Sequence, residues 1–506
     1  MLSVSQTNIT SAATVIMVMV AASKILGVVK LRMMSARFTP DDLGVFFAAF
    51  RLPNLLFEFL VLGALTSAFI PVFTRLLSLN KKDEAYHMSS SIINIGTALT
   101  VIFSLPILIF TKEFSNLLAP GFSDQQITLM SSFTRLIIVF QVVPLIIGNF
   151  LTGMLQSYKK FLIPALAPVI YDVGIILSIY ILAPTLGLYS AVYGVIIGAV
   201  LFLLIQAPII YSLGFRHKFV FDVKNKGVQE VGKLMLPRTI GLAASQIDTT
   251  TDLILASLLG ARAVTIFSFA QILQQLPILL FGSTIAQASL PTMSEETATD
   301  PEKFKTTLLT SLNQILFLVV PAGVILLILR IPIVRLAFGA KLFDWEATIL
   351  TGQTLAFFSL SVFAQSSVQI LARGFYALHD SKTPVVIGII SVLINVFFSI
   401  FFIILLKLPV WSLGLSTSIA SIFNAVFLMI YLHKKTGGFN LNSLINSPLK
   451  ILVASLITGI FLYIPMKLLD QMVFDTTRTV NLILLTSVVS AIGFLVYLFL
   501  ASILKI

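Results

Sequence analysis

Long apolar runs are the feature of this sequence that most restricts its fold. Stretches of about 20 residues with few charges recur along the whole chain, and this is the length that an α-helix needs to cross a bilayer. Charged residues make up only 11% of the 506 residues, whereas a soluble domain carries about 25% to solvate its surface. The runs show no two-residue alternation, which excludes an outer-membrane β-barrel. The sequence therefore predicts an all-α integral membrane protein.

Polar breaks between these runs define about fourteen predicted transmembrane helices. The predicted spans are 10–32, 43–77, 88–111, 130–156, 162–183, 188–212, 231–258, 262–291, 306–330, 349–374, 384–406, 412–433, 449–468 and 480–503. The polar N-terminal segment lacks basic residues and is not followed by a small-residue cleavage site. We therefore expect the first span to be retained and not removed as a signal peptide.

Lysine and arginine are distributed unevenly between the predicted loops. If both termini are cytoplasmic, the inner loops collect most of the basic residues, including the pairs Lys81-Lys82 and Lys434-Lys435. Basic loops are retained on the cytoplasmic side of a membrane, so this orientation is the predicted one. The net charge of +12 then reflects topology, and the chain has no basic soluble domain that would bind nucleic acid.

The sequence matches itself weakly at an offset of about 220 residues. Residues 21–24 align with 243–246, Pro71 with Pro291, Thr134 with Thr354, and Pro164 with Pro384. The repeated unit is six spans, and an even number of spans preserves orientation, so the halves are predicted to be parallel repeats around a central cavity. The predicted lobes are 1–220 and 221–435, followed by a two-span appendage, 436–506. Duplicated bundles of this kind are mostly transporters, and a scaffold without transport is the alternative.

Polar residues on the first span form one candidate binding surface. Ser23, Gly27 and Lys30 share a helical face, and Lys24 lies beside it. An ionisable group inside a span costs at least roughly 2.5–3.5 kcal/mol, so such groups face a protein interior or water. We predict that these residues form a basic cavity wall. The alternative for Lys30 is that its side chain snorkels to the membrane interface.

Arg51 lies on the second predicted span, two residues before Pro53. Proline lacks a backbone N–H and breaks the helical hydrogen-bond ladder, which predicts a kink at this position. A cation beside a broken helix suits an anionic ligand. The alternative is that Glu58, on the same face, neutralises Arg51 as a structural pair.

A second candidate site consists of oxygen ligands for a cation. Asp248 and Asp252 lie one helical turn apart on the seventh span and could hold a cation or share a proton. Asn395 and Thr417, on the eleventh and twelfth spans, would add neutral oxygen ligands. The alternative for these last two is hydrogen bonding between helices.

Several kinds of chemistry are excluded by the sequence. There is no cysteine, which excludes disulfides and thiolate catalysis. No phosphate-binding loop, dinucleotide-binding turn or nucleophile elbow occurs. We therefore expect no enzymatic activity, no cofactor and no certain metal site. Any transport would be driven by a gradient of Na⁺ or H⁺, by the membrane potential or by the substrate gradient.

Five segments of the sequence form a recognisable set: FFAAFRLPN at 46–54, AFIPV at 68–72, LAPGF at 118–122, FLIPALAP at 161–168 and LARGFYALHDSKTP at 371–384. Together they resemble the MurJ/MviN lipid II flippase family. The resemblance covers residues 15–435. It implies a protein of the bacterial inner membrane that moves the undecaprenyl-pyrophosphate-linked peptidoglycan precursor from the inner to the outer leaflet for cell-wall synthesis. It also implies membrane lipids and cell-wall synthases as partners.

The resemblance assigns roles to the candidate residues. Lys24 and Lys30 occupy positions where the family usually has arginines, Arg51 keeps the basic residue, and these groups would bind the pyrophosphate with Ser23 beside them. The last two spans would form a groove for the lipid tail. Some members bind sodium between spans seven, eleven and twelve, a role for Asp248 or Asp252 with Asn395 and Thr417.

This chain departs from the family pattern at several positions. Gly44 replaces an aspartate, Leu62 a glutamate, Gln271 and Ile272 an Asp-Arg pair, and Ser399 an acidic ligand. These losses leave two alternatives open: a flippase for another polyprenyl-linked oligosaccharide, and a membrane scaffold that has lost its substrate site.

Overall fold

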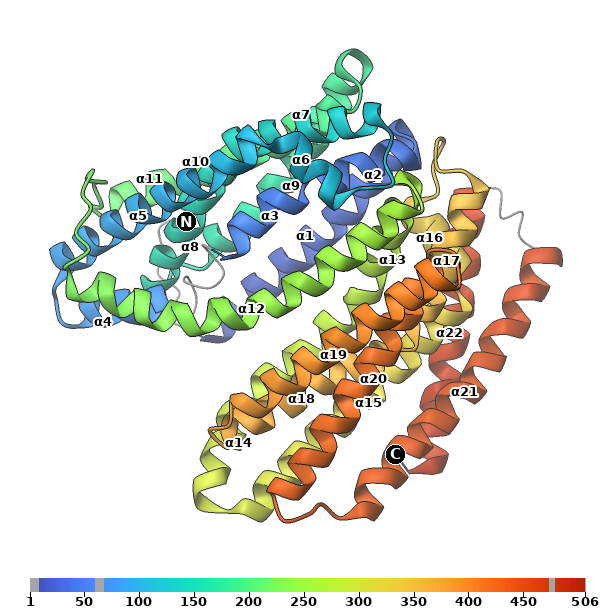
Figure 1. Cartoon of the computed structure of the whole chain (residues 1–506). Helices are drawn as coiled ribbons and strands as arrows, with labels where there is room; N and C mark the ends of the chain where they lie inside the picture. The colour runs from blue at the N-terminus through green and yellow to red at the C-terminus, as the bar shows by residue number, and fades with distance from the viewer. Residues whose placement is uncertain (1–8, 60–67, 473–477, 506) are drawn as a thin grey trace. The chain divides into compact units, whose positions relative to one another are not determined.

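The computed structural model describes residues 9–59, 68–472 and 478–505, and these residues are almost entirely helical (Figure 1). The chain forms two compact units. The first comprises Met1–Val264 with Ala340–Phe343, and the second comprises Thr265–Gly339 with Asp344–Ile506. The prediction of an all-α protein is confirmed. The lobe boundary at residue 220 and the central cavity between the repeats stay predictions.

The first unit contains helices α1 to α12, and α13 (Ala261–Pro277) continues the chain into the second unit. Its helices are α1 (Ile9–Arg37), α2 (Pro40–Ala49), α3 (Arg51–Phe57), α4 (Ile70–Ser78), α5 (Lys82–Ile109), α6 (Thr111–Leu118), α7 (Asp124–Phe140), α8 (Val142–Ser157), α9 (Leu162–Leu186), α10 (Tyr189–Leu204), α11 (Ala207–Ser212) and α12 (Lys226–Leu258). Helix α9 packs against both α1 and α10. In the core of the unit Phe69 stacks on Phe73 and meets Phe150 edge to face.

The second unit contains the remaining helices, including the two-span appendage. Its elements are η3 (Ile278–Ser283), α14 (Thr284–Thr299), α15 (Pro301–Ile328), α16 (Arg330–Phe338), α17 (Trp345–Ser359), α18 (Val362–Ala377), α19 (Lys382–Ile400), η4 (Phe401–Leu405), α20 (Trp411–Lys435), α21 (Leu441–Met472) and α22 (Thr479–Leu504). Helix α21 packs against α15 and α22. A small buried cluster of Leu329, Leu462 and Leu485 joins the appendage to the rest of the unit.

Helices long and apolar enough to cross a bilayer support the membrane assignment. Among the described residues there are nine such helices, or up to eleven if each of two bent helix pairs is one span. The other three predicted spans are 10–32, 43–77 and 231–258. The first and the last overlap α1 and α12, which include residues whose side chains are not described, and residues 60–67 of the second, between α3 and α4, lie outside the described part of the chain. The predicted membrane protein is confirmed, while the number fourteen stays a prediction.

Matching irregularities in the two units support the internal repeat. The α7–α8 pair and the α17–α18 pair are each bent by 41°, and the breaks contain Gln141 and Ser361, which lie 220 residues apart. At the following turns, Lys159 and His379 both adopt positive φ, at 58° and 55°. Each turn is closed by a hydrogen bond of 2.9 Å from the next backbone N–H to a carbonyl five residues earlier. Such shared backbone detail is expected from duplication.

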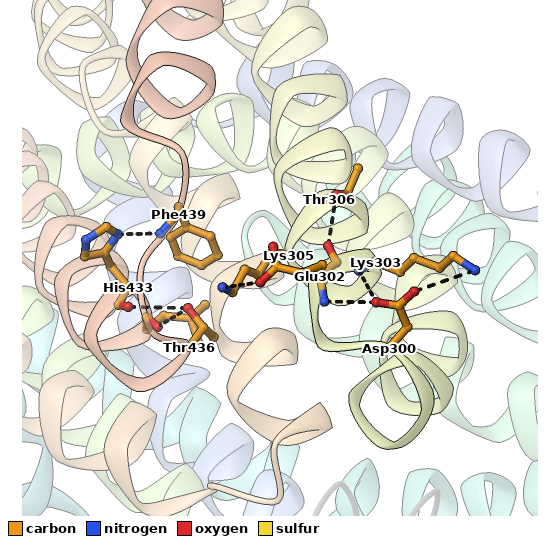
Figure 2. Close-up of polar contacts among 9 residues, drawn as sticks. Asp300, Glu302, Lys303, Lys305, Thr306, His433, Thr436 and Phe439 are labelled. Atoms are coloured by element: carbon orange, nitrogen blue, oxygen red, sulfur yellow. Dashed lines mark hydrogen bonds and ion pairs between the residues drawn. The ribbon is translucent and has the colours of Figure 1, made fainter.

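Capping interactions fix two turns in the second unit (Figure 2). The carboxylate of Asp300 accepts the backbone N–H of Glu302 at 3.2 Å and begins α15. At the end of α20, Gly438 adopts a φ of 101° and donates its N–H to the carbonyl of His433 at 2.8 Å. The N–H of Phe439 then donates to Nδ1 of His433 at 2.9 Å. Glycine tolerates this left-handed conformation without steric cost, so the chain turns sharply into α21.

Candidate functional site

The predicted kink at Pro53 is confirmed, because α2 ends at Ala49 and α3 begins at Arg51. Proline cannot donate to the carbonyl four residues earlier, which here belongs to Ala49. That carbonyl instead accepts a hydrogen bond from the hydroxyl of Thr134 on α7, at 3.1 Å. The break therefore leaves no orphaned acceptor at Ala49, and it places Arg51 at the first turn of α3.

Arg51 is buried, with 7% of its surface exposed, and it is bound to α12. Its Nη2 donates to the carbonyl and to Oε1 of Gln246, both at 2.7 Å. Its Nε donates to the hydroxyl of Thr250 at 2.9 Å. Nε2 of Gln246 donates in turn to Glu58. The Gln246 amide thus bridges Arg51 and Glu58. The alternative of a structural pair between these two residues is therefore realised through Gln246.

A second cation of the first unit is held by an acidic residue. Nζ of Lys30 lies 2.5 Å from Oδ1 of Asp172 on α9. The hydroxyl of Ser23 donates to Oδ2 of the same carboxylate at 3.4 Å. Ser23 and Lys30 therefore share a helical face, as predicted. The side chains of Lys30 and Asp172 are 21% and 10% exposed, so most of this ion pair is enclosed by protein.

Tyr171, the neighbour of Asp172 on α9, contacts the break between α7 and α8. Gln141, which lies in this break and is 4% exposed, donates from Nε2 to the hydroxyl of the neighbouring Tyr171 at 3.2 Å. Helix α9 packs against both α1 and α10. The carboxylate of Asp172 is therefore directed at α1 from a well-packed helix.

The predicted pyrophosphate-binding residues form two groups on the first unit. Ser23 and Lys30 meet at Asp172, and Arg51 lies in a separate network with Gln246 and Thr250. Lys24 is exposed beside the first group. Two enclosed cations and one exposed cation can stabilise an anionic group, since charge-assisted hydrogen bonds offset its desolvation. Their role in substrate binding stays a prediction.

The four predicted cation ligands belong to different units. Asp248 and Asp252 lie on α12 of the first unit, whereas Asn395 and Thr417 lie on the packed helices α19 and α20 of the second. Asp252 and Asn395 are buried, at 4% and 2% exposed. The hydroxyl of Thr417 donates to the carbonyl of Leu413 at 2.9 Å, the hydrogen bond within one helix that is usual for threonine. A shared cation site stays a prediction.

Gly44, one of the departures from the family pattern, has a steric explanation. A Cβ atom at this position would lie 1.8 Å from the carbonyl oxygen of Ala261, which is closer than any real contact. Helix α2 therefore meets the start of α13 so closely that aspartate does not fit. Nothing in the structure explains the replacements at Gln271 and Ile272. Leu62 lies outside the described residues.

The second unit contains an apolar pocket beside α21, one of the two helices that are predicted to form the lipid-tail groove. Its volume is about 510 Å³, and its walls come from α15, α18, α20 and α21. Leu316, Leu371, Met429 and Leu449 are among the lining residues. A neighbouring pocket of about 620 Å³, between α14, α15 and α21, includes the polar side chain of Asn313. Residues of α21 line both pockets, and the first pocket is almost entirely apolar.

The loop with the strongest family resemblance is stabilised by Asp380. The Lys435 ammonium and the backbone N–H of Thr383 hold the pKa of the Asp380 carboxyl well below its usual range. The hydroxyl of Thr383 also donates to this carboxylate at 2.7 Å. These contacts join the start of α19 to the end of α20, and they explain in structural terms why this loop carries Asp380 and Thr383.

Asp172 is the site residue that the sequence reasoning missed. It lies in the apolar run at 162–183, where an ionisable side chain is costly and therefore informative. Its partner could not be identified from the sequence, because α1 and α9 are separated by more than a hundred residues. Gln246 and Thr250 were missed as partners of Arg51 for the same reason.

Solved membrane transporters share this arrangement of helices, which defines the class of the protein. A structure described as the lipid II flippase MurJ in an inward closed conformation aligns with a TM-score of 0.80 at 24% identity, covering 96% of this chain and 98% of that one. An inward-facing multidrug transporter of the MATE family and MOP superfamily aligns with a TM-score of 0.67 at 16% identity, covering 82% and 94%. The chain therefore has the fold of these membrane proteins.

Sequence comparisons then identify the particular family. The family model described as lipid II flippase MurJ matches residues 38–477. A probable lipid II flippase MurJ of Borreliella burgdorferi is 29% identical over 401 residues, 76% of each chain. A relative from Bdellovibrio bacteriovorus with the same description is 26% identical over 474 residues, 92% of this chain and 88% of that one. The chain belongs to the lipid II flippase MurJ family and is a multi-pass bacterial membrane protein.

Proposed function

We propose that this protein is a lipid II flippase, which moves the undecaprenyl-pyrophosphate-linked peptidoglycan precursor from the inner to the outer leaflet. The observation that carries the proposal is the family match over residues 38–477. The matches to curated relatives extend over most of both chains, so the likeness is not confined to one motif. Transport would proceed by alternating access, with no covalent step and no cofactor.

The cations of the first unit suit the headgroup chemistry of this substrate. A pyrophosphate cannot cross hydrocarbon unaided, because a charged group loses its hydration there. Lys30 and Arg51 supply charge-assisted hydrogen bonds that offset this loss. Lysine lacks the planar fork with which arginine grips a phosphate, whereas Arg51 carries this fork but would have to exchange its contacts with Gln246 and Thr250 to present it to the headgroup.

The apolar pocket of about 510 Å³ beside α21 suits the other end of the substrate. A prenyl tail is an uncharged hydrocarbon and requires only an apolar groove that is open to the lipid. The walls of the 510 Å³ pocket are almost entirely apolar, in contrast to the ionic groups on α1 and α9. We propose that the tail lies along α21 during transport.

The proposal also covers the orientation of the protein in the membrane, the ion that drives transport and the partner enzymes. Both termini would be cytoplasmic, in accord with the basic loops, in a bacterial inner membrane. Na⁺ or H⁺ would be the coupling ion, with Asp248, Asp252, Asn395 and Thr417 as the candidate ligands. Cell-wall synthases would consume the flipped precursor.

Complementation in a bacterium depleted of its own lipid II flippase tests this function. We expect the gene to restore growth and cell shape. The Arg51→Ala variant should fail at equal membrane abundance. If the well-expressed protein does not support growth, the assignment to lipid II is wrong. Rescue of a strain that lacks a flippase for a different polyprenyl-linked oligosaccharide would then favour that alternative, and failure of both would favour a scaffold.

A further inference from the structure

The pairing of Lys30 with Asp172 raises a question that the proposed function leaves open. A cation that binds an anionic headgroup must be available to it. Lys30 is instead engaged at 2.5 Å by a carboxylate. Ser23, on the same face of α1, donates to the other oxygen of that carboxylate. An incoming phosphate and Asp172 would therefore compete for one ammonium group.

The chemistry of the membrane interior explains why such a competitor would be present. A lysine without a partner in a span is costly and tends to move towards the interface. A carboxylate on the facing helix holds the ammonium in one place while no anion is bound. The same carboxylate weakens anion binding, because its negative charge repels a phosphate close to it. The pair thus links the position of Lys30 to the occupancy of the site.

We propose that Asp172 is a positioning residue that holds Lys30 in the empty site and takes it back when the anionic headgroup leaves. Asp172 then limits the affinity for the pyrophosphate, which favours its release after transport. This inference rests on the proposed function. It gives Asp172 on α9 a role in binding. It also predicts that removal of this charged residue raises the affinity for the headgroup, whereas removal of a residue at a binding site usually lowers it.

A purely structural ion pair is the competing explanation. In that case Asp172 would only fasten α1 to α9, and its removal would lower stability without improving anion binding. Arg51 offers an internal contrast, because its partners Gln246 and Thr250 are neutral side chains. Removal of those partners would relieve no repulsion, so tightening should be specific to Asp172.

The test measures binding of undecaprenyl pyrophosphate to the purified full-length protein in detergent. Inorganic pyrophosphate and uncharged undecaprenol serve as separate probes of the headgroup and the tail. We expect Asp172→Asn to bind undecaprenyl pyrophosphate about tenfold more tightly than the unaltered protein and to turn over more slowly in vesicles. Lys30→Gln should bind more weakly, and undecaprenol binding should not change in either variant. Asp380→Asn, which removes the acidic member of another Lys–Asp pair outside the α1–α9 contact, is the matched control and should leave affinity unchanged.

A double-mutant cycle separates the two explanations. Asp172→Asn should tighten binding about tenfold in the unaltered protein and clearly less beside Lys30→Gln, because only the direct repulsion by the carboxylate, and not its competition for Lys30, then remains. Equal or weaker binding by a folded Asp172→Asn variant overturns the inference, as does a tightening of equal size in both backgrounds. If Asp172→Asn alone does not fold, Asp172→Ser replaces it in both comparisons. If the unaltered protein binds neither undecaprenyl pyrophosphate nor inorganic pyrophosphate, the proposed function fails and the inference falls with it.

Discussion

The two units have matching backbones and different polar chemistry. At the bend of the first unit, Gln141 donates to Tyr171, next to the ion pair of Asp172 with Lys30. At the equivalent bend of the second unit, Ser361 accepts hydrogen bonds from Gln274 at 3.0 Å and from Gln365 at 3.1 Å. The side chains that contact the bend are neutral in both units, and the first unit adds an ion pair at the next residue of α9.

The residues of the second half that align with Lys30 and Asp172 do not preserve the charges of this ion pair. At the offset of 222 residues that aligns the first spans of the two halves, Lys30 corresponds to Asp252. At the offset of 220, Asp172 corresponds to Val392. The duplicated fold thus keeps its bends and turns, while the charges at equivalent positions are lost or reversed. Function in such a protein depends on side chains that the symmetry of the fold does not specify.

Arg51→Ala should have the largest effect and would test whether the charge of the first unit is essential. The change leaves Gln246 and Thr250 without their buried partner, which costs about 3 kcal/mol for hydrogen bonds to a charged group. We expect loss of growth rescue and a clear drop in melting temperature. Gln271→Ala, at the repeat position in α13, is the matched control and should be nearly neutral. Equal effects at both positions would contradict the asymmetry between the units.

Gly44→Ala should be the next most damaging change. Its new Cβ would lie 1.8 Å from the carbonyl oxygen of Ala261, so the helices must separate, at a cost of about 1–3 kcal/mol. Gly388→Ala, on α19, is the control because nothing lies within 4 Å of the added atom. That variant should be neutral or slightly stabilised. Thermal unfolding of both variants in detergent checks this prediction, and equal melting temperatures would show that the close approach is absent.

Lys30→Gln should reduce transport without unfolding the protein. We expect the rate to fall about tenfold, which corresponds to about 1.4 kcal/mol, because one cation of the headgroup site is lost. Lys30→Arg should retain most of the activity, since it keeps the charge. Transport rates measured in vesicles at matched protein levels check this. A fully active Lys30→Gln protein would remove Lys30 from the site and restrict the comparison between units to Arg51.

Asp380→Asn should have the smallest effect, and this effect should depend on pH. The pKa of Asp380 is lowered by Lys435 and Thr383, so its ionised form stabilises the folded state. That contribution is complete above the ordinary aspartate pKa of about 3.9 and is lost as pH falls through the lower folded-state value. For an exposed pair we expect about 0.5 kcal/mol.

The measurement is the difference in melting temperature between Asp380→Asn and the unaltered protein at pH 7 and at lower pH. The difference should be present at neutral pH and should shrink as the pH falls below about 4. A difference that is independent of pH would mean that the ionised carboxylate is not what stabilises this loop.

The helices, the break before α3 and the internal repeat could be predicted from the sequence. Pro53 predicts the break at Arg51, and the apolar runs predict the helices, because the bilayer permits so few backbone structures. The pairing of Lys30 with Asp172 could not be predicted, because it depends on which faces of α1 and α9 meet. The steric requirement for Gly44 likewise depends on a contact between segments that are distant in the chain.

The most direct test of the proposed function is the movement of fluorescent lipid II across reconstituted vesicles, followed with a quencher that cannot cross the membrane. We expect the unaltered protein to accelerate movement well above protein-free vesicles. Lys30→Gln should be slower and Arg51→Ala inactive, whereas Gln271→Ala should behave normally. Folded, unaltered protein that moves lipid II no faster than empty vesicles would contradict the central claim.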